Sequence, residues 1–308
     1  MGKVLLFYKY VTISDPEKIK NWLLHLCRSL NITGRIIIAH EGINATVAGS
    51  IEATETFRQE FEQHELFDNI DFKESAGDAD CFPKLRVVVK EEIVKLGVSP
   101  TLITAENGGQ HLTPQETHEL LNNKPDDLVI LDTRNIYESN IGRFEEAILA
   151  PIDNFRDLPQ YLDDNQDLFK DKDVLMYCTG GIRCERATAY LKSKNIARNV
   201  YQIAGGIHRY AEAFPDGHFR GKNYVFDARI ALPVTSDILS SCAFCTKPCD
   251  DYTNCINAQC NKQIIVCPSC IDHYHNTCSA YCQNLVDNNM VNVRILPKKV
   301  LVSQHCSL

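Results

Sequence analysis

The sequence predicts an α/β protein in three parts: an N-terminal α+β domain, an α/β domain with a parallel sheet, and a cysteine-rich C-terminal segment. The order of apolar runs and helical patterns over residues 1–98 predicts the first part. Strand patterns that alternate with helical patterns over residues 113–222 predict the second. Nine of the fourteen cysteines lie between Cys242 and Cys282, within the segment 223–308. A chain of 308 residues is long enough for this division.

Six successive elements define the N-terminal domain. Residues 3–11 have the pattern of an apolar strand. Ser14 and Glu17 then have capping-box spacing at the start of a helix whose apolar residues repeat with helical period. The elements that follow are two strands joined by a turn over 34–50, a helix capped by Ser50, and a β-rich stretch over 85–97. This order is that of a ferredoxin-like α+β sandwich.

The second domain follows residues 99–112, which have the composition of a linker. Thr113 is the predicted N-cap of its first helix, with Pro114 at the first helical position and Glu116 at capping-box spacing. Strand patterns separated by helical patterns come next, at 127–134, 173–178 and 197–206. This alternation predicts a small α/β domain with a parallel sheet.

Composition favours a globular protein that acts inside the cell. Apolar residues make up 44% of the chain and charged residues 23%. The sequence has no run of about 18 apolar residues, and its first apolar stretch is too short for a signal peptide, so we expect a cytoplasmic protein with no membrane contact. The formal net charge of −8 argues against a general polyanion binder but leaves room for a local basic groove.

A cysteine at the end of a buried strand is the main candidate for chemistry. Cys178 ends the pattern at 173–178, and ligands collect at the carboxyl ends of strands in open α/β sheets. A Gly-Gly turn, an arginine and a helix start follow, and inward-pointing N–H groups with nearby positive charge favour a thiolate. We therefore expect the sulfur of Cys178 to be ionised and accessible. The predicted active-site loop comprises Thr179, Gly180, Gly181, Ile182, Arg183 and Cys184.

The alternative is that Cys178 is a small core residue, as buried free cysteines often are. Four residues separate Cys178 from Arg183, one fewer than in the loop of protein tyrosine phosphatases. The tighter ring suits a single sulfur atom better than a phosphate. Cys184 has two interpretations: it resolves an oxidised Cys178, or it packs at the start of the helix.

The C-terminal cysteines have the spacing of metal ligands. Cys242 and Cys245 form one C-x-x-C pair, and Cys267 and Cys270 form another. Two such pairs commonly bind one tetrahedral Zn²⁺, and four thiolates leave no open position, so we expect structural zinc. Four of the five remaining cysteines could bind a second ion, and the fifth would then not be a ligand: Cys249, Cys255, Cys260, Cys278 and Cys282. A disulfide cage or simple packing are the alternatives, and the expected reducing compartment disfavours the cage.

Four segments between residues 113 and 214 resemble a rhodanese domain, which carries sulfur as a cysteine persulfide. They read LTPQETHELL, VILDTRNIYE, VLMYCTGGIRCERA and VYQIAGGIHRY. By this resemblance Asp132 and Arg134 brace the domain and Arg183 is the arginine of the active loop. Cys184 departs from the serine found in many single-domain members.

The chain as a whole is similar to the bacterial rhodanese-related tRNA uridine hydroxylases. The resemblance rests on HEGINATVAG and FPKLRVVVKEEIVKLG in the first part, CTGGIRCERA in the second, and CAFCTKPCDDYTNC with CPSC in the third. It implies that tRNA is the partner, at its anticodon region, and that molecular oxygen is the cosubstrate for converting the wobble uridine to 5-hydroxyuridine. Cys178 matches the essential loop cysteine. The sequence shows no signature of an organic cofactor.

Two other functions remain open from the residues alone. One is a sulfurtransferase that passes persulfide sulfur to an acceptor, and the other is a non-catalytic binding module stabilised by zinc. If RNA binds, the loop arginine and three further basic side chains are expected to contact its phosphates: Lys84, Arg86 and Arg186.

Overall fold

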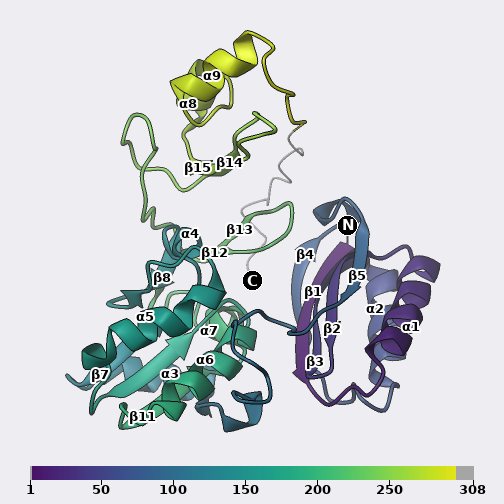
Figure 1. Cartoon of the computed structure of the whole chain (residues 1–308), viewed down its shortest axis with the longest axis vertical. Helices are drawn as coiled ribbons and strands as arrows, with labels where there is room; N and C mark the ends of the chain where they lie inside the picture. Colours follow the sequence, from purple (N-terminus) through teal and green to yellow (C-terminus); the bar gives the residue numbers. More distant parts are fainter. Residues whose placement is uncertain (1, 296–308) are drawn as a thin grey trace.

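The computed structural model describes residues 2–295, so the last part of the predicted C-terminal segment, 296–308, lies outside the described residues. Figure 1 shows three units, with the cysteine-rich one lying beyond the other two. None of the helices over 2–295 has the length and apolar character that a membrane crossing needs.

The N-terminal domain is a five-stranded sheet with two helices on one face (Figure 1). The strand order β4-β1-β3-β2-β5 contains the antiparallel β4-β1-β3-β2 arrangement of a ferredoxin-like fold, which confirms the predicted class. Its elements are β1 (Gly2–Tyr10), α1 (Pro16–Ser29), β2 (Thr33–Ala39), β3 (Gly42–Ser50), α2 (Ile51–Glu62), β4 (Lys73–Gly77) and β5 (Leu85–Val89). The helices lie on the side away from the second domain, so the other face of the sheet is turned toward that domain.

Three details of this domain differ from the sequence-based prediction. Asp15, not Ser14, caps α1, and its side chain accepts a hydrogen bond from the backbone N–H of Lys18 at 3.0 Å. The fourth strand of the sandwich is β4, a polar strand that the sequence pattern did not reveal. The predicted β-rich stretch over 85–97 supplies only β5, an additional edge strand that runs parallel to β2.

The second domain has a five-stranded parallel sheet in the order β6-β11-β10-β7-β9, as predicted for its class. Thr113 and Glu116 form the predicted capping box. The elements are β6 (Gln110–Leu112), α3 (Pro114–Asn122), β7 (Leu128–Asp132), α4 (Ile136–Ser139), β8 (Gly142–Phe144), β9 (Ile148–Leu149), α5 (Leu158–Asp164), β10 (Asp173–Tyr177), α6 (Ile182–Ser193), β11 (Asn199–Ile203) and α7 (Gly206–Ala213).

The segment between the two domains packs against the second one. Leu96 and Ile103 belong to the hydrophobic cluster beneath α6. β6 lies within the stretch 99–112 and pairs with β11, so the second domain begins earlier than expected from the linker-like composition.

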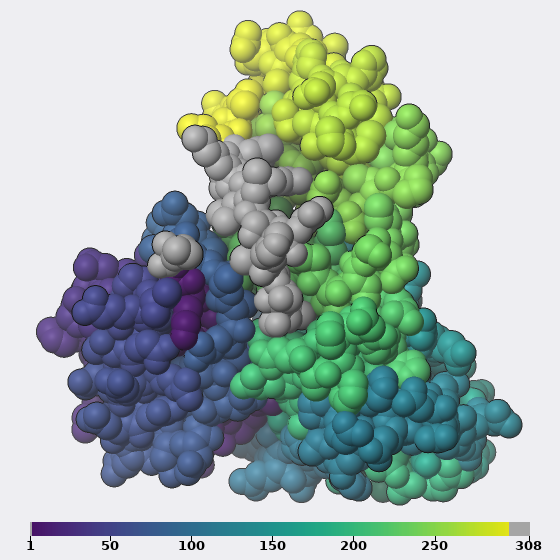
Figure 2. Space-filling view, turned by 180° about the vertical axis from the view of Figure 1, so that it is seen from behind, coloured from purple at the N-terminus to yellow at the C-terminus, as the bar shows by residue number. Residues whose placement is uncertain are grey.

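The cysteine-rich unit lies at one end of the molecule, against the second domain (Figure 2), where the Tyr252 hydroxyl donates to the carbonyl of Tyr137 at 2.8 Å. Before it, β12 (Phe219–Tyr224) pairs with β8, and β13 (Ala231–Pro233) pairs with β12, so this stretch joins the second domain. The unit itself contains β14 (Tyr252–Asn254), β15 (Gln263–Ile265), α8 (Pro268–His273) and α9 (Ala280–Asp287).

Candidate active site and metal centres

Cys178 follows the last residue of β10, at the carboxyl edge of the parallel sheet. The chain then turns through Gly181, whose φ of 102° is in a region that side chains disfavour, and α6 begins at Ile182. The turn directs the backbone N–H of Gly181 to the sulfur of Cys178, at 3.2 Å. The loop thus holds the thiol against an amide donor at a helix N-terminus.

The surroundings of Cys178 favour its ionised form. Burial opposes ionisation, but the neighbouring Cys184 thiol, the charge of Arg183 and backbone N–H groups outweigh it and lower the pKa of Cys178 to about 6. Burial and the adjacent Cys178 sulfur raise the pKa of Cys184 well above its ordinary value. Of the two neighbouring thiols, Cys178 therefore ionises more readily than Cys184.

Arg183 is held by a carboxylate that the sequence analysis missed. Its guanidinium donates to both oxygens of Glu138, at 2.6 and 2.7 Å, and to the hydroxyl of Thr179 at 3.2 Å. Glu138 is buried and also accepts from the backbone N–H of Asn135 at the start of α4. The capping-box spacing of Asn135 and Glu138 was the available sequence signal. Arg183 thus acts on Cys178 from a fixed position.

Asp132 and Arg134 form a fully buried ion pair behind the loop. The guanidinium contacts the carboxylate at 2.9 and 2.6 Å and donates to the carbonyl of Gly142 at 2.6 Å. Ser139 donates to the same carboxylate. The pair joins the end of β7 to α4 and β8.

The expectation that Cys178 is accessible is wrong for this structure, in which its exposed fraction is 1%. The open face of the N-terminal sheet covers the loop. A Cβ atom on Gly180 would lie 3.0 Å from Leu6, and one on Gly181 would lie 2.7 Å from the Tyr8 hydroxyl. The Tyr8 hydroxyl also donates to Glu185 in α6 at 2.8 Å. The site is therefore built from two domains.

The HEGIN segment fixes the connection between these domains. The Glu41 carboxylate accepts the backbone N–H of Ile93 at 2.8 Å, and the Asn44 side chain donates to the carbonyl of Ile93 at 2.9 Å. Arg186, on α6, contacts Glu92 in the same connecting segment. Its guanidinium is fully buried and also donates to two backbone carbonyls, so the expected phosphate contact of Arg186 is replaced by a structural one.

The expected phosphate contact of Arg183 is likewise replaced, because its guanidinium is buried against Glu138. The remaining predicted RNA contacts, Lys84 and Arg86, are exposed. Arg86 in β5 is paired in register with Arg35 in β2, which is also exposed. Arg35 is in register with Thr46, and Thr46 with Leu6. Since residues in register share a face of a sheet, Arg35 and Arg86 lie on the same face as the Leu6 that covers the loop.

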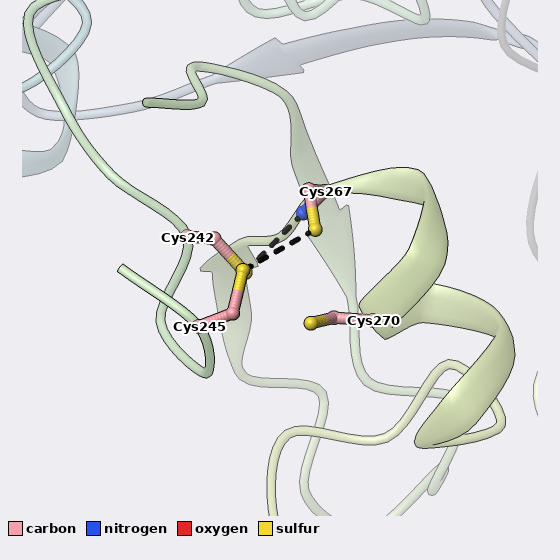
Figure 3. Close-up of side chains that lie close together, drawn as sticks. All are labelled: Cys242, Cys245, Cys267 and Cys270. Carbon is pink, nitrogen blue, oxygen red and sulfur yellow. Dashed lines mark hydrogen bonds between the residues drawn. The ribbon is translucent and has the colours of Figure 1, made fainter. Parts of the chain in front are cut away.

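Two groups of four cysteines have the geometry of metal centres. In each group the four sulfur atoms lie within 4.8 Å of one another. Figure 3 shows the first, formed by Cys242, Cys245, Cys267 and Cys270, with a Cys245–Cys267 sulfur distance of 3.6 Å. The second is formed by Cys255, Cys260, Cys278 and Cys282, which leaves Cys249 as the spare cysteine. Tetrahedral coordination at about 2.3 Å per Zn–S bond requires sulfur separations of about 3.8 Å. Each group therefore fits one Zn²⁺ of its own.

Comparisons with known proteins cover almost the whole chain. Residues 2–93 match the family described as UPF0176 acylphosphatase like domain, residues 113–213 the rhodanese-like domain, and residues 220–283 the rhodanase C-terminal family.

Three curated relatives carry the name tRNA uridine(34) hydroxylase. The protein of Acholeplasma laidlawii is 39% identical over 94% of this chain and 92% of its own length. That of Corynebacterium urealyticum is 39% identical over 90% of this chain and 96% of its own length. That of Listeria welshimeri is 40% identical over 91% of this chain and 89% of its own length. With this identity along nearly the full length of both partners, the chain belongs to the tRNA uridine(34) hydroxylase family.

Proposed function

We propose that this protein hydroxylates uridine 34, in the anticodon of tRNA, to 5-hydroxyuridine, with molecular oxygen as cosubstrate and Cys178 as the attacking group. The name of its relatives supports the substrate and the reaction. The observation that carries the role of Cys178 is its environment, where an amide donor, Arg183 and Cys184 lower the thiol pKa to about 6. A thiolate is the reactive form of cysteine toward an electrophilic carbon.

A thiolate solves the main chemical difficulty of this reaction. C5 of uracil reacts poorly with oxygen until the ring carries more electron density. Addition of the Cys178 sulfur at C6 forms an S–C6 bond and moves the C5–C6 π electrons toward C5 and O4. The activated C5 then takes one atom of dioxygen. The other atom leaves as water with two electrons and two protons from a thiol reductant, and loss of the C5 proton expels Cys178.

Basic side chains on the open sheet face are proposed to hold the RNA backbone. Arg35 and Arg86 have no ion-pair partner among residues 2–295, and they lie two and three strands away from Leu6, or about 10 and 14 Å at ordinary strand spacing. Each phosphate contact contributes about 0.7 to the salt slope of RNA binding, so Arg35→Gln with Arg86→Gln should reduce that slope by about 1.4. Arg198→Gln is the control, because Arg198 is exposed but already paired with two carboxylates. An unchanged slope in the double variant would exclude this surface.

Each group of four cysteines is proposed to hold one structural Zn²⁺. All four ligands of each ion would be thiolates, so neither ion retains a position for water or substrate. The apolar cluster within the cysteine-rich unit is small and consists largely of the cysteines themselves, and Tyr252 packs instead in a cluster shared with the second domain, which Ile265 also contacts. Zinc would therefore supply most of the stability of this unit.

Isotope labelling tests the proposed reaction. The purified protein, a tRNA with uridine 34, a thiol reductant and isotopically labelled dioxygen should give 5-hydroxyuridine that carries the label. Label taken from solvent water would contradict dioxygen as the source of the oxygen atom.

The rhodanese-like match favours one other function, transfer of persulfide sulfur. A persulfide on Cys178 that turns over thiosulfate and cyanide, with no change in tRNA, would support sulfur transfer over hydroxylation.

A further inference from the structure

A pocket of about 360 Å³ lies where the N-terminal sheet meets α6. This volume is at the lower end of the range of roughly 300–1,000 Å³ that small-molecule sites occupy. Its lining comes from β1, the residues before and at the start of β4, the connecting segment and Glu185 of α6. The pocket is therefore next to the thiol loop but is formed mainly by the other domain.

The lining has the chemistry of a nucleobase site. Tyr8 and Tyr10 are half-buried and lie two residues apart on the same face of β1, with ring centroids 6.3 Å apart. Such aromatic side chains on an open sheet face commonly stack on single-stranded bases. The lining also includes Lys73, Asp71 and Glu106. Ammonium donors match the carbonyl oxygens of uracil, and carboxylate acceptors match its N3–H.

Lys73 is the unusual member of this set. Its side chain is 1% exposed, although lysines are rarely buried so completely. Its Nζ lies 2.7 Å from Asp71 and 5.2 Å from the centre of the Tyr8 ring. Asp71 is also contacted by Arg209, so the carboxylate has a second cation and does not need Lys73 for charge balance.

The stem of Lys73 lies against the thiol loop. A Cβ atom on Gly180 would be 3.8 Å from its Cδ, and one on Gly205 would be 3.4 Å from its Cε. Lys73 therefore borders both the pocket and the loop that carries Cys178. Tyr8 also borders both, because its hydroxyl lies next to Gly181 and the residue lines the pocket.

We propose that this pocket receives the target uracil, stacked on Tyr10, and that the Lys73 ammonium donates a hydrogen bond to O4 of the base. The inference rests on the proposed function, in which Cys178 adds at C6. The addition places negative charge on O4, and no oxidant takes part in it. A fixed ammonium in a site shielded from water stabilises that charge strongly. The Tyr8 side chain lies over Gly181, between the pocket and the loop, so it has to move aside for C6 to reach the sulfur.

Proton exchange at C5 measures this step without oxygen. When the thiolate adds at C6, C5 takes a deuteron from D₂O, and reversal of the addition releases either isotope. Under nitrogen, the wild-type protein should therefore introduce deuterium at C5 of uridine 34, and mass spectrometry of the nucleoside detects it. Lys73→Met should slow this exchange about 100-fold or more, which is the usual loss when one oxyanion donor is removed. Affinity for tRNA should fall much less than the exchange rate, because the negative charge on O4 develops only when the thiolate adds.

Three variants complete the test. Lys3→Met is the matched control, because Lys3 lies on β1 and pairs with Glu55 and Glu74 away from the pocket, and it should exchange like the wild type. Lys73→Arg keeps a cation and should recover part of the rate. Tyr10→Ala, which does not alter the buried ion pair, should weaken tRNA binding by roughly 10-fold through lost stacking.

The outcomes separate the two proposals. Exchange that requires Cys178 but is equal in wild type and Lys73→Met would overturn the role of Lys73 and leave the proposed function intact. Unchanged tRNA affinity in Tyr10→Ala would overturn the placement of the base in this pocket. Absence of exchange in the wild type would overturn attack at C6, and with it this inference.

Discussion

Arg183 should be a main source of the low pKa of Cys178, and its removal gives a quantitative prediction. Arg183 is paired with Glu138, so its removal alone would leave a buried carboxylate without a partner. The double variant Arg183→Met with Glu138→Gln removes both charges together. An unpaired opposite charge nearby lowers a pKa by roughly 1–3 units, but the Glu138 carboxylate offsets part of the Arg183 charge at the sulfur, so we expect the pKa of Cys178 to rise by roughly one unit or less. At pH 7 a pKa of about 6 leaves about 90% of the thiol ionised, and a rise of a full unit would leave about half.

The ultraviolet absorbance of the thiolate, followed against pH and corrected with Cys178→Ala, gives this pKa without requiring access to the sulfur. Arg198→Met is the control for loss of a surface arginine. Stability provides an independent check. The folded pKa of about 6 lies below the unfolded value near 8.5, so ionisation stabilises the fold above that higher pH, and the contribution is lost as the pH falls through about 6. If the absorbance titration of the double variant still has its midpoint near pH 6, the role given to Arg183 is refuted.

Three further predictions concern the metal centres, the loop and the domain interface. Elemental analysis should find two zinc ions per chain, reduced to about one in Cys270→Ser and unchanged in Cys249→Ser. An equal loss of zinc in both variants would contradict the two ligand sets. Gly206→Ala, at φ 63°, would bring a Cβ to 2.4 Å from the carbonyl of Cys178, so denaturant unfolding should show a loss of about 1 kcal/mol or more, and wild-type stability would contradict the loop geometry. Arg186→Gln removes a fully buried cation from the partly buried Glu92 and from two backbone carbonyls, and it should cost about 3 kcal/mol by the same measurement. A loss of tRNA affinity at full stability would restore Arg186 as a phosphate contact.

Local sequence signals predicted the parts of this fold that depend on local chemistry. The capping box at Thr113 and the three central strands of the parallel sheet were read from neighbouring residues, and the structure confirms them. β4 was missed because its sequence, KESAG, is polar and lacks a strand pattern.

Sequence patterns did not predict the contacts between segments that are far apart in the chain. Arg186 looks like a solvated residue of a helix, but it is buried against Glu92, 94 residues earlier in the chain. In the same way, no periodicity indicates that Leu6 and Tyr8 cover the loop of Cys178. The division of the C-terminal cysteines into two groups also depends on how α8 and α9 fold back on the β14–β15 pair.

The most direct test of the account is the nucleoside composition of tRNA after incubation with the protein. Wild-type protein and Cys178→Ala would each be incubated with a tRNA that has uridine 34 and a thiol reductant, under air and under nitrogen. The account predicts 5-hydroxyuridine at position 34 only with the wild-type protein under air. Formation of the same product by Cys178→Ala, or by the wild-type protein under nitrogen, would contradict it.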